Sequence, residues 1–198
     1  MQQHYYSKEQ SSQLKIKHLV LNIRGISLNL QSSTGIFSKK AVDKGTLALI
    51  ENMVINPGWQ ILDLGSGYGA VGLVAGKLAG CNPYLIDINK RACMLAKQNA
   101  RHNNIIAKVL NGNLYEPVNN QKFDTILVNP PQTAGKSICF AMIEGAKEHL
   151  KNHGLLQLVA RPNKGGNTLA NKMEEVFGNM QIIGRRSGYA VYVSKKIS

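Results

Sequence analysis

Apolar and polar positions change their spacing along the chain, and these changes outline a series of strands and helices. Residues 14–33 alternate apolar and polar side chains around a central Arg-Gly pair, which predicts a β-hairpin. Residues 42–53 have helical character and end before the turn signal Asn-Pro-Gly at 56–58. The chain therefore begins with a hairpin, a loop and a helix.

Beyond residue 58, short apolar runs alternate with helical stretches. The runs that we interpret as buried strands are WQILDLG, NPYLIDI, IAKVLNGN, FDTILVN and GLLQLVARP. The helix KSICFAMIEGAKEHLKN is expected to continue until Gly154, and residues 180–196 predict a closing hairpin. Strands that alternate with helices imply parallel βαβ units. We predict an α/β fold: a doubly wound, Rossmann-like, seven-stranded sheet with a C-terminal antiparallel hairpin and a small N-terminal β-hairpin extension.

Length and composition fit one domain in a reducing compartment. The chain has 198 residues, of which 43% are hydrophobic, so it can form a substantial core. No run of about 18 apolar residues suggests a membrane span, and the polar start lacks an apolar signal region. Three cysteines without paired spacing indicate free thiols. We therefore expect a cytoplasmic protein without a membrane partner.

Positive charge is concentrated at the two ends of the chain. The net charge is +13, and residues 1–44 and 161–198 each carry seven basic and two acidic side chains. One interpretation is a solvated surface that favours solubility. The interpretation we favour is that both basic segments bind a polyanion, for which RNA is the usual candidate.

A glycine-rich turn connects the first predicted parallel strand to its helix. Gly65, Gly67 and Gly69 allow a tight turn and a close approach of the backbone to a ligand. The spacing also satisfies the dinucleotide fingerprint, and Asp87 lies 20 residues after Gly67, where a ribose-binding acid belongs. A nicotinamide or flavin enzyme therefore has to be considered.

The acidic residue before this turn favours a cationic ligand instead. Asp63 would lie beside a bound pyrophosphate and repel it. S-adenosylmethionine carries a sulfonium and an ammonium group, no phosphate, and a ribose that Asp87 could hold. The pattern therefore favours S-adenosylmethionine over a dinucleotide, although Asp63 could also simply cap the turn.

Asn129, Pro130 and Pro131 end the apolar run FDTILV, at the edge of the sheet where α/β proteins bind ligands. The Asn129 side-chain oxygen and the Pro130 carbonyl are two acceptors that suit an NH2 group. If both hydrogens of a conjugated amine are held out of the ring plane, the nitrogen lone pair points at the methyl group of the donor. Catalysis would then come from positioning and electrostatics. The alternative is a loop in which Asn129 only caps the strand.

Together these segments resemble the class I S-adenosylmethionine-dependent methyltransferases with an N-P-P motif. The resemblance is nearest to the methyltransferase domain of the ribosomal RNA small-subunit guanine-N2 methyltransferases, including their single-domain archaeal-type relatives. It covers nearly the whole chain, in the segments HYYS, STGIFSKKAVDKGT, ILDLGSGYGAVGL, DINKRACMLAKQNARHN, NLYEPV, FDTILVNPPQTAGK and SGYAVYVSKK. It implies a substrate- and cofactor-covering extension at 1–44 and a catalytic domain at 45–198.

The resemblance also implies site residues. Gly65, Gly67 and Gly69 would line the methionine part of the donor near Asp63, Asp87 would bind the ribose, and Asn129, Pro130 and Pro131 would hold the target amine. Further donor contacts are implied for Ile88, Asn113, Leu114, Phe37 and Asp43.

Gln132 departs from the family pattern, because many relatives have a base-stacking aromatic residue after the second proline. Either Phe37 or Phe140 stacks instead, although Phe37 could equally anchor the hairpin, or the target differs. Gln132 could itself hydrogen-bond a base edge. Trp59 and Tyr189 are expected to pack in the fold. Lys136 could contact a phosphate or simply start a helix. Plausible phosphate contacts, each with solvated surface as the alternative, are Arg161, Lys164, Arg185 and Arg186.

The function favoured at this point is methylation of an exocyclic RNA amine, most specifically guanine N2 in ribosomal RNA or tRNA. The alternatives are a protein glutamine amide N-methyltransferase, a DNA adenine N6-methyltransferase, and a non-catalytic RNA-binding module. No metal is expected, because His149 and His153 lack further ligands nearby.

Overall fold

The computed structural model describes residues 16–33, 42–130 and 135–197. Its elements follow the predicted order. The strands are β1 Ile16–Ile23, β2 Ile26–Ser33, β3 Ile61–Leu64, β4 Tyr84–Asp87, β5 Lys108–Asn111, β6 Phe123–Val128, β7 Leu150–Ala160, β8 Gln181–Arg186 and β9 Tyr189–Lys195. The helices are α1 Lys44–Asn52, α2 Ala70–Ala79, α3 Lys90–His102, α4 Lys136–His149 and α5 Asn167–Phe177, with short turns η1 Glu116–Val118 and η2 Pro162–Gly166.

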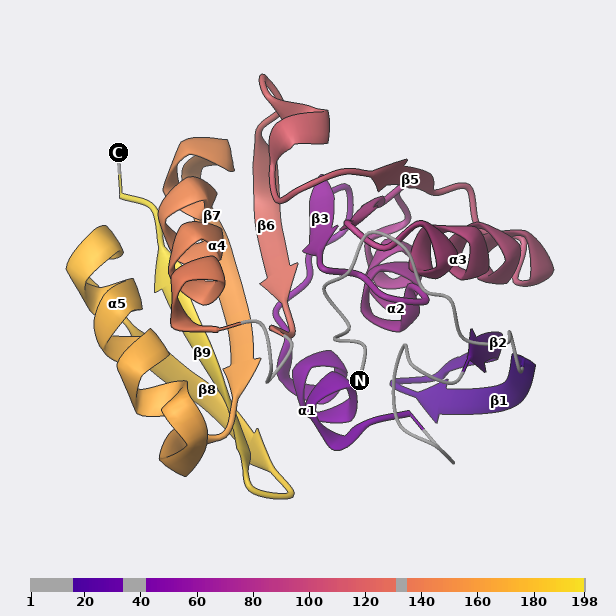
Figure 1. Ribbon diagram of the computed structural model, residues 1–198, viewed down its shortest axis with the longest axis horizontal. Coiled ribbons are helices and arrows are strands. Elements are labelled where there is room, and N and C mark those ends of the chain that lie inside the picture. The colour runs from indigo at the N-terminus through magenta and orange to yellow at the C-terminus, as the bar shows by residue number, and fades with distance from the viewer. Residues whose placement is uncertain (1–15, 34–41, 131–134, 198) are drawn as a thin grey trace.

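Seven strands form one sheet in the order β5-β4-β3-β6-β7-β9-β8 (Figure 1). The first five strands in this order run parallel, and β9 lies antiparallel between β7 and β8. The strand order reverses between β3 and β6, which places these two strands side by side in the middle of the sheet. This arrangement confirms the predicted doubly wound sheet with a C-terminal antiparallel hairpin.

Helices cover both faces of the sheet, which explains why the central strands are apolar runs without alternation. Leu127 of β6 packs into a core with α1, α2 and α3, whereas its neighbours Ile126 and Val128 pack on the other face with α4 and α5. All three side chains are 0% exposed. The carboxyl ends of β3, β4 and β6 are left to carry the loops of the site.

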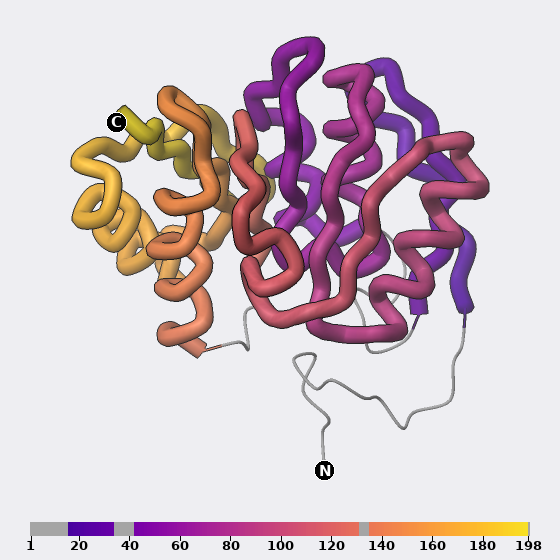
Figure 2. Tube along the Cα trace, turned by 90° about the horizontal axis from the view of Figure 1, so that it is seen from above, coloured from indigo at the N-terminus to yellow at the C-terminus, as the bar shows by residue number. Residues whose placement is uncertain are grey.

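The hairpin β1–β2 is part of the same core. Leu28 and Leu30 are 0% and 1% exposed and belong to the cluster of α1, α2 and α3. Asn99 of α3 pairs with the backbone of Gln31, accepting from its N–H at 2.6 Å and donating to its carbonyl at 2.9 Å. Figure 2 shows the hairpin at the end of the molecule away from the C-terminal elements.

One predicted boundary is wrong. The helix expected to reach Gly154 ends at His149, and β7 already begins at Leu150. Leu150 pairs with Phe123 of β6, and the ladder resumes at Leu155 after a shift in register. Among the described helices, none has the length and apolar character needed to cross a membrane.

Candidate active site

The site lies where three neighbouring parallel strands end. Leu64 of β3 is in register with Ile86 of β4 on one side and with Val128 of β6 on the other. The glycine turn, Asp87 and Asn129 follow or end these strands, so the topology brings all three predicted segments to one edge of the sheet.

The glycine turn needs glycine for its backbone. Gly65, Gly67 and Gly69 have φ values of 74°, 56° and 91°, in the left-handed region that other residues rarely adopt. The N–H groups of Gly65 and Ser66 both donate to the Ile86 carbonyl at 2.9 Å. A Cβ on Gly69 would lie 2.9 Å from Leu85 Cδ2, so Gly69 also permits close packing of α2 on the sheet.

Asp63 is a buried carboxylate at this turn. Its side chain is 2% exposed, and Oδ2 accepts a hydrogen bond of 2.7 Å from the Gly72 N–H. Burial raises the pKa of Asp63 to about 7; the Gly72 hydrogen bond opposes the rise, and the charge of Asp87 adds to it. Within the described residues, no lysine or arginine forms an ion pair with Asp63. The carboxylate is therefore suited to a cationic group brought by a ligand.

Asp87 orders the turn as well as facing the site. Its Oδ2 accepts from the Gly67 N–H and its Oδ1 from the Asn89 N–H, both at 2.8 Å. Asn111 donates to the carbonyls of Asp87 and Ile88 at 2.9 Å, a contact that the sequence analysis missed. These bonds fix the tip of β4 at the position expected of a ribose-binding acid.

The residues expected at the adenine follow β4 and β5. Ile88 is partly buried, and Asn113 is exposed and donates to Glu116 at 3.3 Å. Leu114 has a positive φ of 47° and packs against the core on the face of the sheet that α4 and α5 cover. Phe37, Pro131 and Gln132 lie outside the described residues.

Asn129 is held by the first turn of α1. Its Nδ2 donates to Thr46 Oγ1 at 3.0 Å and lies 3.4 Å from Asp43 Oδ1. Asp43 caps α1 by accepting from the Thr46 N–H at 2.9 Å. With the Asn129 NH2 group directed at these acceptors, its carbonyl oxygen remains for a ligand. Asp43 is a residue type that is common at a helix N-cap, and its side chain accepts from the N–H of Thr46, three positions later. This N-cap pattern is the sequence signal that could have predicted where α1 begins.

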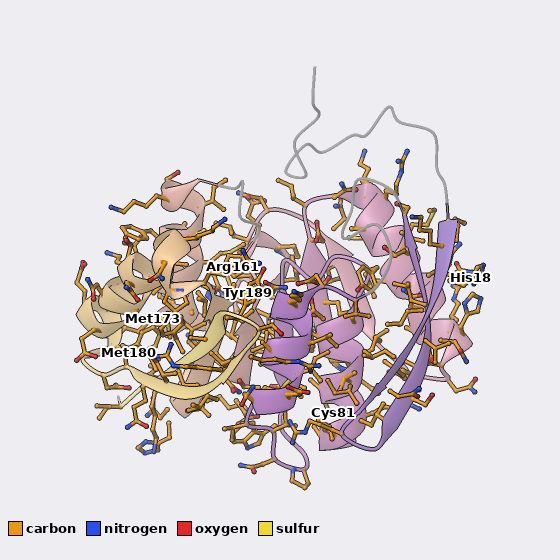
Figure 3. The ribbon with its side chains drawn as sticks, turned by 90° about the horizontal axis from the view of Figure 1, so that it is seen from below. His18, Cys81, Arg161, Met173, Met180 and Tyr189 are labelled. Carbon is orange, nitrogen blue, oxygen red and sulfur yellow. The ribbon has the colours of Figure 1, made fainter. Side chains whose placement is uncertain are left out.

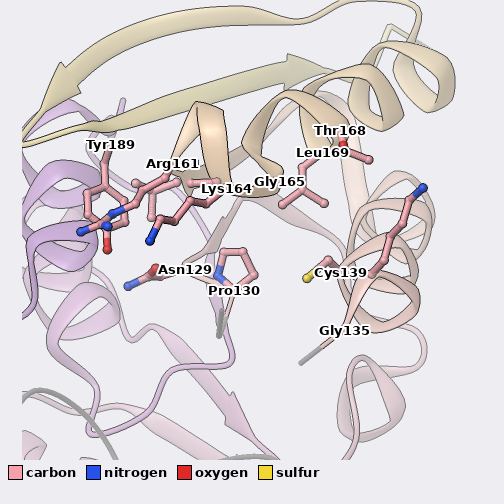
Figure 4. Close-up of a pocket in the computed structure, with 13 residues that line it drawn as sticks. Asn129, Pro130, Gly135, Cys139, Arg161, Lys164, Gly165, Thr168, Leu169 and Tyr189 are labelled. Atoms are coloured by element: carbon pink, nitrogen blue, oxygen red, sulfur yellow. The ribbon is translucent and has the colours of Figure 1, made fainter. Parts of the chain in front are cut away.

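A cavity of about 250 Å³ opens beside Asn129 (Figure 4). Of the predicted substrate contacts, Lys136, Arg161 and Lys164 line it, together with Tyr189. Phe140 does not line it; its ring lies on α4 with Lys136 Nζ 5.1 Å and Lys172 Nζ 5.3 Å from its centroid. A smaller space of about 10 Å³, lined by Asp63, Gly65 and Asn129 among others, joins the glycine turn to the N-P-P loop.

A basic groove of about 670 Å³ continues from this cavity. It is lined by Arg161, Pro162, Asn163, Lys164, Arg185, Arg186, Ser187, Gly188 and Tyr189. We call this set the basic groove. All its residues come from the C-terminal segment, so in the described part of the chain the N-terminal segment does not contribute to it. Arg186 also forms an ion pair with Glu51 of α1.

Comparison with known proteins shows what the sequence is similar to. The sequence matches the methyltransferase small domain family over residues 27–193. It is 34% identical over 203 residues to the uncharacterized protein YbxB of Bacillus subtilis, with 100% of both chains covered. It is 31% identical over 150 residues to the ribosomal RNA small subunit methyltransferase C of Psychromonas ingrahamii, covering 73% of this chain and 43% of that relative. The match to the ribosomal RNA small subunit methyltransferase C of Colwellia psychrerythraea has 26% identity and covers 50% of that protein. The chain thus spans about half the length of these methyltransferase C relatives.

A solved structure shares the fold. The Thermus thermophilus 16S rRNA N2 G1207 methyltransferase, determined in complex with AdoMet and guanosine, superimposes with a TM-score of 0.80. The match covers 95% of this chain and 52% of that one at 24% identity. The likeness shows a class I methyltransferase fold over almost the whole chain.

Proposed function

The chain belongs to the methyltransferase small domain family, and from this premise we propose that it methylates the exocyclic N2 amine of a guanine in ribosomal RNA, with S-adenosylmethionine as the donor. The observation that carries the proposal is the anchored Asn129 amide. Its NH2 group is held by Thr46 and Asp43, which leaves its oxygen as an acceptor between the glycine turn and a cavity lined by cations. The names of the ribosomal RNA methyltransferase C relatives support the RNA substrate.

S-adenosylmethionine fits the residues at the glycine turn. Asp63 is a buried carboxylate without a cationic partner in the described chain, which suits the ammonium group of the donor. Asp87 accepts a backbone hydrogen bond at each carboxylate oxygen, from Gly67 at Oδ2 and from Asn89 at Oδ1, which fixes the carboxylate at the tip of β4 to accept from a ribose hydroxyl. Ile88, Asn113 and Leu114 would contact the adenine.

Asn129 and Pro130 would act on the target amine. The Asn129 oxygen and the Pro130 carbonyl accept the two amine hydrogens, so that the nitrogen lone pair turns out of the ring plane. When bound, S-adenosylmethionine supplies a methyl carbon activated by the sulfonium, and the carbon–sulfur electron pair leaves with the sulfur as that bond breaks. The amine nitrogen provides the electron pair of the new bond to carbon and afterwards releases one proton to water.

The basic groove would hold the RNA backbone next to the target base. Lys164, Arg185 and Arg186 are spaced along it, and Lys136 lines the cavity on the α4 side. Phosphate contacts of this kind fix the register of a nucleic acid without reading its sequence. Pro131 and Gln132 would complete the loop that faces the base.

The test is to incubate the protein with labelled S-adenosylmethionine and with separate ribosomal RNA and tRNA fractions, followed by nucleoside mass analysis. We expect N2-methylguanosine in ribosomal RNA. The Asn129→Ala variant is expected to bind the donor and transfer no methyl group, whereas Asn120→Ala, an exposed asparagine outside the site, should act like the wild type. Methylated adenosine, labelled protein, or no donor binding at millimolar concentration in calorimetry would overturn the proposal.

A further inference from the structure

Arg161 and Tyr189 form one wall of the cavity opposite the N-P-P loop. Arg161 directly follows β7 and Tyr189 begins β9, and the neighbouring residues Ala160 and Ala190 pair across these two strands. The Arg161 guanidinium carbon lies 4.8 Å from the centroid of the Tyr189 ring. Figure 3 shows the two side chains beside each other, and Figure 4 shows them above Asn129 and Pro130.

Tyr189 reaches the acceptor that is proposed to hold the target amine. A Cβ built on Gly45 would lie 3.0 Å from Tyr189 Cε1 and 3.1 Å from Asn129 Oδ1, so the ring and the amide oxygen approach the same point. Tyr189 was expected to be a packing residue, and it does pack against the core of α1, α2 and α3 while it also lines the cavity. It therefore brings an aromatic ring close to Asn129 from a strand far in sequence from the N-P-P loop.

Arg161 is an arginine without a carboxylate partner. Within the described residues its guanidinium makes no ion pair, and its buried Nε has no hydrogen-bond acceptor. A guanidinium held over a ring face keeps a planar fork of N–H donors, which suits two adjacent acceptors. Lys164 is a point charge in the same cavity. Arg161, by contrast, can donate to two neighbouring acceptors on one edge of a base and so distinguish between bases.

The ligand edge that fits is the O6 and N7 edge of guanine. Arginine pairs with these two acceptors in a bidentate manner, whereas adenine has a donor in place of O6. At about 250 Å³ the cavity is slightly smaller than a pocket for a drug-sized ligand, so it suits a single unstacked base.

We propose that Arg161 reads the O6/N7 edge of the target guanine across the cavity from Asn129, and that Tyr189 holds the guanidinium in position for this. Arg161 is then the residue that determines base specificity, and Tyr189 is a positioning residue. The proposal rests on the proposed function for the identity of the base.

Free nucleosides test this pocket independently of methyl transfer. The probes are guanosine, inosine, adenosine and 2-aminopurine riboside, titrated by ligand-observed NMR into the protein with S-adenosylhomocysteine present. Inosine keeps O6 and N7 and lacks the amine, whereas 2-aminopurine riboside keeps the amine and lacks O6. We expect inosine to retain most of the guanosine affinity, and adenosine and 2-aminopurine riboside to bind roughly tenfold more weakly or worse.

Matched variants test whether the preference for guanosine depends on the Arg161 guanidinium or only on a positive charge in the cavity. Arg161→Gln should lose the guanosine preference, because its amide cannot donate to O6 and N7 together and instead suits the N6/N7 edge of adenine. Arg161→Lys should keep only part of the preference, because an ammonium can still donate to both acceptors but lacks the planar fork. Lys164→Gln should leave the base preference unchanged. Tyr189→Phe should keep the preference and Tyr189→Leu should lose it, with thermal unfolding checking that each variant is folded.

The outcomes distinguish the two proposals. A wild type that binds adenosine as well as guanosine, or binds neither at millimolar concentration, would overturn the role of Arg161. An Arg161→Gln variant that still prefers guanosine would overturn it too. If the guanosine preference follows Arg161 but no N2-methylguanosine forms in RNA, the pocket is supported and the proposed reaction fails.

Discussion

Asn129 donates a hydrogen bond of 3.0 Å from its side-chain nitrogen to the hydroxyl of Thr46, 83 positions earlier in the chain. The Thr46 hydroxyl in turn donates to Asp43 Oδ2 at 2.5 Å. Because a carboxylate only accepts, this chain orients the amide with its NH2 group toward α1. The start of α1 therefore sets which atom of Asn129 is offered to the amine.

Thr46→Val should lower the rate of methyl transfer without changing donor affinity. Valine keeps the shape of the side chain and the helix cap, because Asp43 still accepts from the backbone N–H at position 46. The Asn129 amide loses its hydroxyl partner, and a misplaced catalytic group can cost up to about a hundredfold in rate. We expect kcat to fall roughly tenfold or more, measured by single-turnover methylation of RNA.

Thr46→Ser is the matched control, since it restores the hydroxyl and should recover most of the rate. Calorimetry with S-adenosylmethionine should give the same Kd for all three proteins. An equal loss in the serine and valine variants would argue against the hydrogen bond and for packing of the threonine methyl group.

Donor affinity should rise with pH around neutrality. The pKa of Asp63 is raised to about 7, so the carboxylate is neutral in acid and charged in mild alkali. Only the charged form attracts the donor ammonium group, and the association constant should therefore increase from pH 6 to pH 8. Calorimetry with S-adenosylmethionine across this pH range measures the association constant. The Asp63→Asn variant should bind the donor weakly at every pH. A Kd of the wild type that does not change with pH would contradict the role of Asp63.

The same carboxylate should make the fold less stable as pH rises. Its pKa in the folded state, about 7, lies above the ordinary value of 3.8, so the folded protein binds this proton more tightly than the unfolded chain. The contribution to the free energy of unfolding is therefore most favourable in acid and falls between pH 4 and pH 7, by an amount on the order of 4 kcal/mol.

Asp63→Asn removes this dependence, and its oxygen can still accept from the Gly72 N–H. From pH 5 to pH 8 we expect the stability of the variant relative to the wild type to increase by about 2–3 kcal/mol, because the cost of a buried amide is the same at both pH values and cancels. Urea unfolding at the two pH values provides the comparison. A difference between wild type and variant that is the same at both values would contradict it.

Asn99→Ala should destabilise the protein by about 3 kcal/mol. Asn99 is 0% exposed and bonds to both backbone groups of Gln31 and to the Tyr68 carbonyl at 2.8 Å, so its removal leaves buried backbone groups unpaired. Asn103 makes similar bonds to Asn29 one turn later, where water can replace it. Asn103→Ala should therefore cost only about 1 kcal/mol in denaturant unfolding; equal costs would show that burial is not the reason.

The sequence predicted those parts of the molecule that depend on local pattern. The strand and helix order follows from apolar runs and turns, and Asp63, Asp87 and Asn129 were placed together because parallel strands end at one edge. The end of α4 could not be predicted from the sequence, because β7 begins at Leu150, which pairs with Phe123 of a strand distant in sequence. Thr46 was missed for the same physical reason: its contact with Asn129 joins residues far apart in the chain.

Arg185→Gln should weaken RNA binding evenly across sequences and reduce its dependence on salt. Arg185 is exposed in the basic groove and, within the described chain, makes no ion pair, whereas Arg186 is partly engaged by Glu51. Each phosphate contact to a single strand contributes about 0.7 to the slope of log affinity against log salt. The slope of the variant, measured by fluorescence anisotropy from low to moderate salt, should be smaller by roughly that amount. Arg101→Gln, an exposed arginine on α3 outside the groove, is the control, because it changes the net charge equally. If both variants change the slope alike, net charge and not the groove determines RNA binding.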